Sequence, residues 1–168
     1  MCYNYIKNMS CPEDEEEPIG GIYTNNVSIA MDEWFKDKDA LLIDGIMMSV
    51  GDCRKIANEW KGSKVSFTEM YPTKTQTFEL AKWKGKELRL STCGGWEKYD
   101  LANFIEIMND WEGETLTIGY CGPKIFKNVV EAFKNPKYKT ICFESCDFPN
   151  NFIENINKNV PELTIIVK

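Results

Sequence analysis

The sequence predicts an α/β protein, a short solenoid of about six strand–turn–helix coils whose strands form one parallel sheet. Three observations predict this class: a repeated motif, strand patterns at steps of 22–28 residues, and a helical pattern between successive strands. The chain of 168 residues is also long enough to bury a core without support from a metal or disulfides.

The repeated motif is W-x-G-x-x-L-x-L-x-x-C, in which other apolar residues can replace Leu and Cys. Ungapped copies begin at Trp60, Trp83 and Trp111. Weaker copies flank them, so the strands are expected to start at Leu41, Val65, Leu88, Leu116, Ile141 and Leu163. A period of about 20–29 residues with L-x-L-x-x-N/C at strand and turn is typical of leucine-rich repeats, here in a cysteine-containing form.

Each part of the motif predicts a structural element. L-x-L is a short strand with both apolar side chains on one face, and the Cys position turns inward as the strand ends. A helix is expected next, with the clearest apolar stripe at Leu101, Phe104, Ile105 and Met108. The glycine of each W-x-G is expected to cap a helix C-terminus with positive φ: Gly62, Gly85 and Gly113.

The chain divides into two parts by pattern. Residues 1–36 are expected to form an acidic N-terminal arm, with five acidic residues at 13–17, and a capping helix over 28–36. Residues 37–168 form the leucine-rich-repeat-like domain. The last strand pattern has no helix after it, so this edge is either exposed or capped from outside.

Composition excludes several function classes. The chain has no histidine, which removes Ser-His and Cys-His nucleophile pairs and His-ligated metals. Its only arginines, Arg54 and Arg89, and a net charge of −6 argue against nucleic-acid binding. No apolar run approaches the ~18 residues of a membrane helix, and no secretory signal is present. Seven dispersed cysteines without C-x-x-C indicate reduced thiols, and hence a cytoplasmic or nuclear location.

Candidate catalytic and metal-binding groups have simpler interpretations. The acid pairs Glu97/Asp100 and Glu106/Asp110 have helical spacing, which favours a solvated helix face. The glycines at 94–95 and 119–122 are too few for a phosphate-binding loop. Cys142 and Cys146 form a C-x3-C pair without a second pair to complete a metal site. We therefore expect no enzyme, cofactor or metal centre.

The residues that alternate with the buried strand positions are expected to form an open, mostly small and polar face with isolated charges. This composition suits a protein partner, although a solvated sheet without a partner is the alternative. The predicted protein-binding residues are Lys64, Ser66, Thr68, Glu87, Arg89, Ser91, Thr117 and Glu144. Arg89 is the expected hot spot because it lies mid-face, and Thr164 is expected to continue its row.

The stretch from Trp83 to Ile118 resembles the F-box-associated, leucine-rich-repeat-like domain of nematode F-box proteins. The resemblance rests on Lys86-Glu87-Leu88-Arg89-Leu90 and on the helix pattern of residues 100–111, which begins Asp-Leu and ends in Trp. It extends over roughly residues 28–168, with 83–118 as its specific part. It implies capture of a protein substrate for a cullin-RING ubiquitin ligase. The F-box is missing, which argues against Skp and cullin recruitment by these residues.

The expected function is a non-catalytic protein–protein interaction module that recognises the substrate in an F-box type ligase. The alternative is a structural or coupling subunit of a larger assembly. Short leucine-rich-repeat proteins such as a mitochondrial ATP-synthase coupling factor also end in a strand like Pro161–Ile165. In both cases the partner is a protein, with no nucleic acid and no membrane.

Overall fold

Strands and helices alternate along the chain, as the sequence predicts for an α/β protein. The computed structural model describes residues 21–24, 27, 38–44, 48–91, 100–126 and 128–168. The strands are β1 (Gly21–Thr24), β2 (Ala40–Asp44), β3 (Lys64–Thr68), β4 (Glu87–Ser91), β5 (Thr115–Gly119), β6 (Thr140–Glu144) and β7 (Thr164–Val167). The helices are α2 (Val50–Glu59), α3 (Lys74–Leu80), α4 (Leu101–Met108), α5 (Val129–Ala132) and α6 (Phe152–Asn159), with a 3-10 turn, η3, at Pro123–Phe126.

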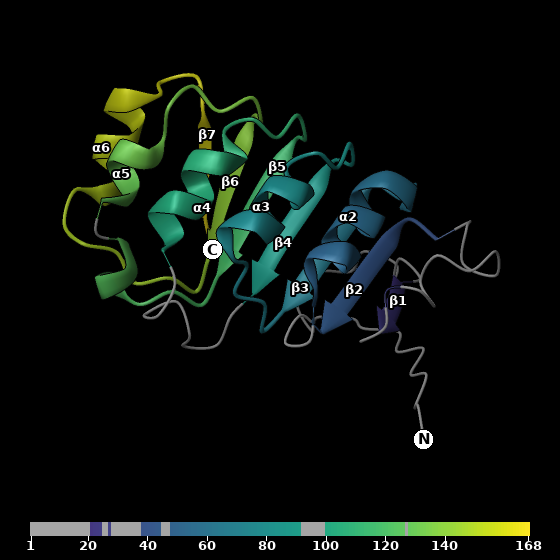
Figure 1. The fold of residues 1–168 in the computed structure, drawn as a ribbon. Helices are drawn as coiled ribbons and strands as arrows, with labels where there is room; N and C mark the ends of the chain where they lie inside the picture. The colour runs from purple at the N-terminus through teal and green to yellow at the C-terminus, as the bar shows by residue number, and fades with distance from the viewer. Residues whose placement is uncertain (1–20, 25–26, 28–37, 45–47, 92–99, 127) are drawn as a thin grey trace, which may run out of the picture.

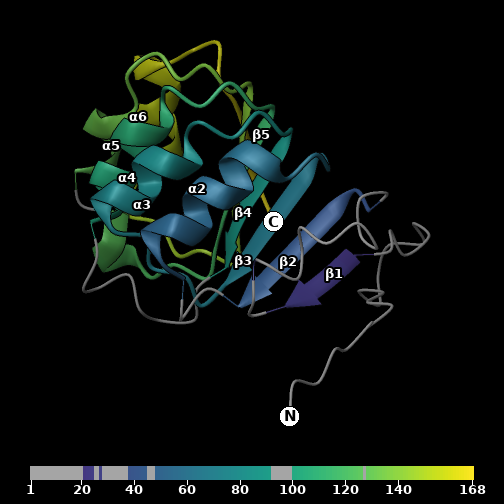
Figure 2. The ribbon, with the colours of Figure 1, turned by 45° about the vertical axis from the view of Figure 1, so that its right-hand side comes forward.

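The strands form one parallel sheet in chain order, β1 to β7. The repeat positions pair directly, so that Val65, Leu88 and Leu116 are successive neighbours across β3, β4 and β5. Figures 1 and 2 show all the labelled helices on the same face of the sheet. This follows from chirality, because right-handed crossovers in a sheet that grows in one direction place every helix on one side. The predicted parallel sheet with alternating helices is therefore confirmed.

One strand was not predicted. β1 pairs with β2 in parallel register, Gly21 beside Ala40, although its sequence G-I-Y-T lacks both L-x-L and W-x-G. It lies within the segment 1–36 that the sequence analysis divides into an arm and a capping helix. The acidic run at 13–17 and the expected helix over 28–36 lie outside the described residues.

The core lies between the sheet and the helices. Its strand positions are fully buried, among them Leu41, Phe67, Leu90, Leu116 and Phe143. Helix α4 adds the predicted stripe, Leu101, Phe104, Ile105 and Met108, all of them buried. The side chain of Asp100 accepts a hydrogen bond from the Asn103 N–H at 3.0 Å, which starts this helix as an N-cap.

The turns after β3, β5 and β6 share a backbone geometry. Glu69, Tyr120 and Ser145 follow β3, β5 and β6 directly and have φ of 54°, 59° and 51°. The Tyr120 N–H donates to the Glu144 carbonyl at 2.8 Å, and the Ser145 N–H donates to the Lys168 carbonyl at 2.8 Å. Each turn is thereby tied to the next strand, and the following residue is directed inward. Met70 and Cys121 are buried at that position, whereas Cys93 lies outside the described residues.

The glycines of W-x-G have a different role from the one predicted. None of Gly62, Gly85 and Gly113 has a left-handed φ, and a Cβ on each would collide with the ring of the preceding tryptophan. The helices have already ended, α3 at Leu80 and α4 at Met108, before these glycines are reached. The expected helix cap is therefore wrong, and glycine is required because the indole ring lies against its Cα.

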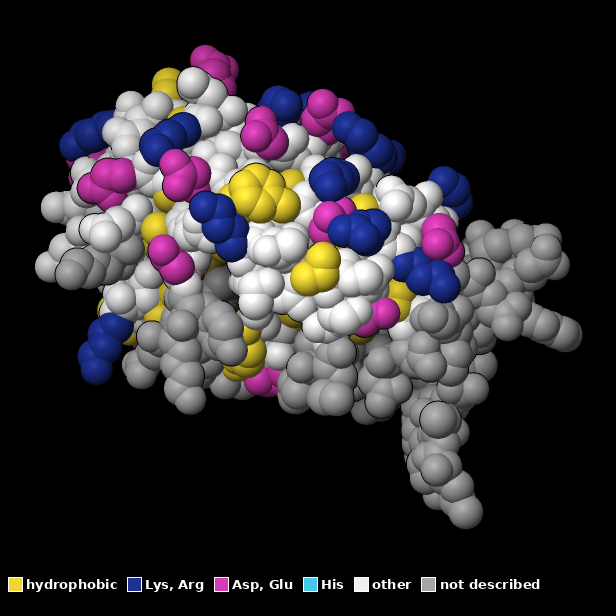
Figure 3. Space-filling view, viewed as in Figure 1, with side chains coloured by type: hydrophobic (Ala, Val, Ile, Leu, Met, Phe, Trp, Pro, Cys, Tyr) yellow, Lys and Arg dark blue, Asp and Glu magenta, His cyan; other side chains and the backbone are white. Residues whose placement is uncertain are grey.

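The helical side carries charges of both signs without a basic patch, as Figure 3 shows. Several of these charges pair between successive coils, as Lys134 does with Glu106 at 2.7 Å. Among the described residues, none of the helices has the length and apolar character that crossing a lipid bilayer requires.

Candidate functional site: the open face of the sheet

The face of the sheet opposite the helices carries the predicted binding residues. Strand side chains alternate between the two faces, so the neighbours of buried Val65, Leu88 and Leu116 point to the open side. The pairing register brings these neighbours into rows across the strands. The middle row is Ser66, Arg89, Thr117, Cys142 and Ile166, and the next row is Thr68, Ser91, Gly119 and Glu144.

The last strand is shifted by two residues from its predicted register. Ile165 pairs with Ile141, so Ile166 rather than Thr164 continues the row of Arg89. The shift arises because the chain makes another turn after α6, in which the Leu163 N–H donates to the Val160 carbonyl at 3.1 Å. Leu163 is buried at 5% exposure but precedes the strand.

The charges on this face are paired. Arg89 on β4 reaches over β5 to Glu144 on β6, with 2.7 Å between Nη2 and Oε2. Lys64 and Glu87 pair between β3 and β4 at 3.3 Å. The expectation of isolated charges is therefore wrong. Lys64 and Glu87 are direct neighbours on adjacent strands, and Arg89 is long enough to reach Glu144 two strands away in the next row.

Two side chains on the open face are nevertheless buried. Thr117 is 9% exposed and Cys142 is 3% exposed. Both occupy the central strands β5 and β6, the part of the face that the Arg89–Glu144 pair spans. Burial raises the pKa of the Cys142 thiol, and the charge of Glu144 raises it further. A partner that binds in this region can therefore contact the side chains of Arg89 and Glu144 more readily than that of Thr117.

A shallow hollow of about 420 Å³ lies over the open face and reaches from β2 to Lys168 beyond β7. Six predicted residues line it: Lys64, Ser66, Glu87, Arg89, Thr117 and Glu144. Thr68 and Ser91 do not line it and lie nearer the carboxyl ends of their strands. The structure therefore brings six of the eight predicted residues around one concavity and leaves two beside it.

A contact between two cysteines escaped the sequence analysis. Cys121 and Cys146 occupy the same position in successive turns, and a hydrogen bond between their side chains raises the pKa of Cys121 and lowers that of Cys146. Their equivalence in the repeat was the signal that could have revealed the pair. The C-x3-C spacing pointed instead to Cys142, which lies on the open face.

The acidic residues considered for acid–base chemistry have structural partners. Glu106 pairs with Lys134 at 2.7 Å, and Asp110 pairs with Lys137 at 3.4 Å. Glu97 and the glycines at 94–95 lie outside the described residues. Within the described ranges, no group of three or more potential metal ligands is found.

No protein-family model and no curated protein matches the chain.

Proposed function

We propose that the chain is a short leucine-rich-repeat-like solenoid that acts as a non-catalytic protein-interaction module, the substrate-recognition domain of an F-box type protein. The observation that carries this proposal is the open face, where a hollow of about 420 Å³ runs across β2–β7 beside the Arg89–Glu144 pair.

Three features support the solenoid part of the proposal. The strand order equals the chain order, and the helices cover one face only. The W-x-G motif recurs with the same ring-on-glycine packing at Gly85 and Gly113. The left-handed turn residue recurs after β3, β5 and β6. A repeat that cannot bury its own apolar face gains its core by stacking on the next one.

The character of the face favours a protein partner. It is wide and shallow, whereas small-molecule sites are usually concave enough to enclose most of the ligand. Its two ion pairs offer charges of both signs, and Arg89 remains 44% exposed despite its partner. Arginine is enriched among residues that dominate the energy of protein interfaces. A bound protein can engage the free edge of the guanidinium and the exposed carboxylate of Glu87.

The F-box assignment rests on the resemblance of residues 83–118. It gives this domain the task of holding the protein to be ubiquitinated and leaves ligase recruitment to another segment or subunit. The described cysteines are free thiols, in keeping with work in the cytoplasm or nucleus.

Affinity capture from cell extract with matched variants tests the proposal. Arg89→Glu should lose the bound substrate proteins. Arg54→Glu is the control, because Arg54 also pairs with one carboxylate, Glu79 at 3.0 Å, but belongs to helix α2 rather than to the sheet. Equal capture by the wild type and Arg89→Glu would contradict the assignment of the face. Skp and cullin subunits among the captured proteins would support the ligase role, and their absence would count against it.

A charge-swap variant separates binding from folding. Arg89→Glu combined with Glu144→Arg restores an internal ion pair but exchanges the positions of the charges. If the partner reads the charge at residue 89, the double variant should be as stable as the wild type and still fail to bind. Recovery of binding would mean that the ion pair matters only for the shape of the face.

A second candidate function, a subunit of a larger assembly, is favoured by the edge strand β7. Ile166 and Val167 are 39% and 55% exposed on this strand. An apolar edge strand is a template for pairing with another chain. In this case Val167→Lys should abolish assembly, measured by analytical ultracentrifugation of the captured complex, while Arg89→Glu should leave it intact.

A further inference from the structure

A row of aromatic rings in contact runs through successive coils at the amino-terminal edge of the sheet. The rings of Trp83 and Trp111 are stacked with centroids 6.2 Å apart and planes at 9°. The Trp111 Nε1–H donates to the Trp83 carbonyl at 2.9 Å, which fixes the second ring. Tyr138 follows, with its ring centroid 6.1 Å from that of Trp111 and its plane tilted by 42°. These three coils therefore supply one ring each, at a spacing of about 6 Å.

The row stops at Tyr138, although the chain continues through another coil. The loops 135–139 and 159–163 have the same length between an asparagine and the next strand, which starts at Thr140 and Thr164 respectively. In this alignment Pro136 corresponds to Val160, and Tyr138 corresponds to Glu162. The last coil therefore has no ring at the positions that supply one in the coils before it.

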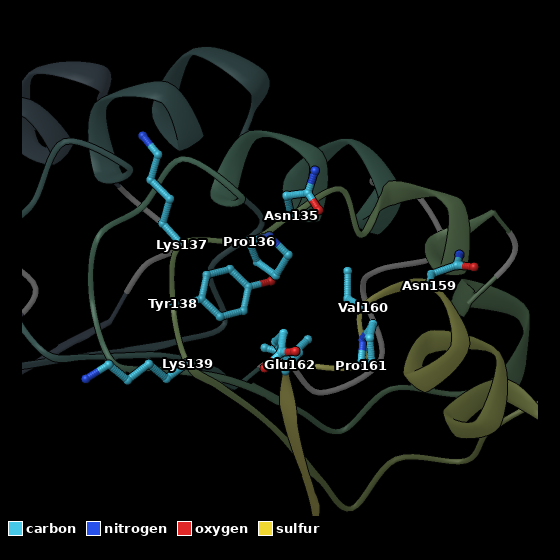
Figure 4. Close-up of a pocket in the computed structure, with 10 residues that line it drawn as sticks. Asn135, Pro136, Lys137, Tyr138, Lys139, Asn159, Val160, Pro161 and Glu162 are labelled. Atoms are coloured by element: carbon cyan, nitrogen blue, oxygen red, sulfur yellow. The ribbon is translucent and has the colours of Figure 1, made fainter.

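A hollow of about 370 Å³ lies between these two loops. Its lining includes Pro136, Tyr138, Val160, Pro161 and Leu163. Figure 4 shows the side chains of Lys137 and Lys139 extending away from the Tyr138 ring, so the lysines leave the hollow uncharged on that side. Its volume falls within the range of about 300–1,000 Å³ that small-molecule sites occupy.

Tyr138, which lines this hollow, has a hydroxyl group that lacks a hydrogen-bond partner among the described residues. Tyr138 is only 2% exposed. Figure 4 shows the oxygen directed from the ring toward Pro136 and Val160. Burial raises the pKa of this phenol, so it keeps its proton and can donate. A buried hydroxyl without a partner is costly, and most are satisfied in native proteins.

We infer that the hollow between loops 135–139 and 159–163 binds a small planar aromatic molecule with a hydrogen-bond acceptor. The ring of the ligand takes the next place in the row beside Tyr138, and its acceptor receives the Tyr138 O–H. The hydroxyl oxygen exposes less than 1 Å², so Pro136 and Val160 must separate slightly as the ligand enters. The site is distinct from the open face of the sheet, because none of its lining residues belongs to the row of Arg89.

Two bicyclic probes of equal size, used with the full chain, test separately whether the hollow binds an aromatic ring and whether the Tyr138 O–H donates to the ligand. Quinoline has a ring nitrogen acceptor, and naphthalene has none. Binding is followed by NMR through the backbone amide signals of residues 135–139 and 159–163. Quinoline should bind roughly 2- to 12-fold more tightly than naphthalene, the range expected for one hydrogen bond. Absence of signal changes in both loops with either probe would overturn the inference.

Three variants assign the contacts. Tyr138→Phe should reduce the affinity for quinoline to that for naphthalene and leave naphthalene binding unchanged. Val160→Trp should place a ring of the chain in the hollow and block both probes; if this variant does not fold, Pro161→Trp serves the same purpose. Arg89→Glu should bind both probes as the wild type does, because it alters only the sheet face.

Several outcomes would contradict the site. A quinoline advantage that survives Tyr138→Phe would mean that its nitrogen contacts another group. Undiminished binding in a folded Val160→Trp or Pro161→Trp variant would place the probes elsewhere. A tryptophan-containing peptide that binds these loops when neither free ring does would make the hollow a contact for a protein chain, and the inference of a small-molecule site would be wrong.

Discussion

Arg89 on β4 and Glu144 on β6 form an ion pair of 2.7 Å that crosses the intervening strand β5. The crossing is possible because β5 presents only short side chains on this face, those of Thr115 and Thr117, and Gly119. The pair joins residues from two different coils and defines the middle of the open face.

The Arg89–Glu144 pair should contribute little to global stability. Its side chains are 44% and 20% exposed, and such pairs are screened by water. A double-mutant cycle with Arg89→Ala and Glu144→Ala should give a coupling energy of about 0.2–1 kcal/mol in urea unfolding. A coupling above about 2 kcal/mol would mean that the pair holds β4, β5 and β6 together.

Trp111→Ala should be strongly destabilising. Trp111 is fully buried, stacks on Trp83 and donates a hydrogen bond to its carbonyl. The loss should be on the order of 3–5 kcal/mol in chemical unfolding, as for other large core truncations. Trp111→Phe keeps a ring and should lose less. A loss below about 1 kcal/mol for the alanine variant would contradict the packing between coils.

Gly113→Ala should also destabilise the protein, by about 1–3 kcal/mol, because the added Cβ would collide with the Trp111 ring. Gly122→Ala is the matched control. A Cβ there meets nothing within 4 Å, and Gly122 does not have a left-handed φ. The control should therefore be neutral or stabilise by up to about 1 kcal/mol. Equal thermal shifts for the two variants would argue against the role given to this glycine.

Stability should fall as the pH falls below about 4.5. Hydrogen bonds from Arg54, Lys134 and Lys84 lower the pKa values of Glu79, Glu106 and Glu112, respectively, from the usual 4.5. The folded state therefore binds fewer protons than the unfolded state. This stabilisation is complete above the unfolded pKa and is lost as the pH falls through the folded values.

Urea midpoints measured between about pH 5 and pH 3 test this dependence. Replacing the three glutamates by glutamine should flatten the profile over this range. A triple variant with the same acid dependence as the wild type would show that other carboxyls govern it.

Cys146 should be the most reactive of the four described thiols. It is partly exposed, and the hydrogen bond from Cys121 lowers its pKa. Burial raises the pKa of Cys53 to about 12, so that thiol should react far more slowly. Iodoacetamide labelling followed by peptide mass spectrometry gives the order directly. Labelling of Cys53 before Cys146 would contradict the surroundings described for these two thiols.

The repeat made most of the fold predictable. Wherever W-x-G precedes L-x-L, as at Trp83 and Leu88, the strand register followed from the sequence because each coil must place the same side chains in the shared core. The last strand lacks that motif, and its predicted register was wrong by two residues. β1 has neither signal, and it owes its place to pairing with β2.

The candidate site was predictable only as a face. Alternation within a strand assigns Arg89, Thr117 and Glu144 to the open side, but it does not reveal which side chain covers which. Thr117 and Cys142 are buried in the part of this face that the Arg89–Glu144 pair spans, and alternation alone predicts neither their burial nor that pair. The sequence could not show that the row of rings ends at Tyr138. This residue is at a position where other coils have glycine, yet its ring packs against Trp111 at a tilt of 42°.

The agreement between strand order and chain order has a consequence for synthesis on the ribosome. Every strand bonds only to the strands before and after it in the chain. A nascent polypeptide that has emerged as far as Gly119 already holds both neighbours of β2, β3 and β4. Folding can therefore keep pace with translation, each new coil docking on a finished one, without waiting for a distant segment to emerge.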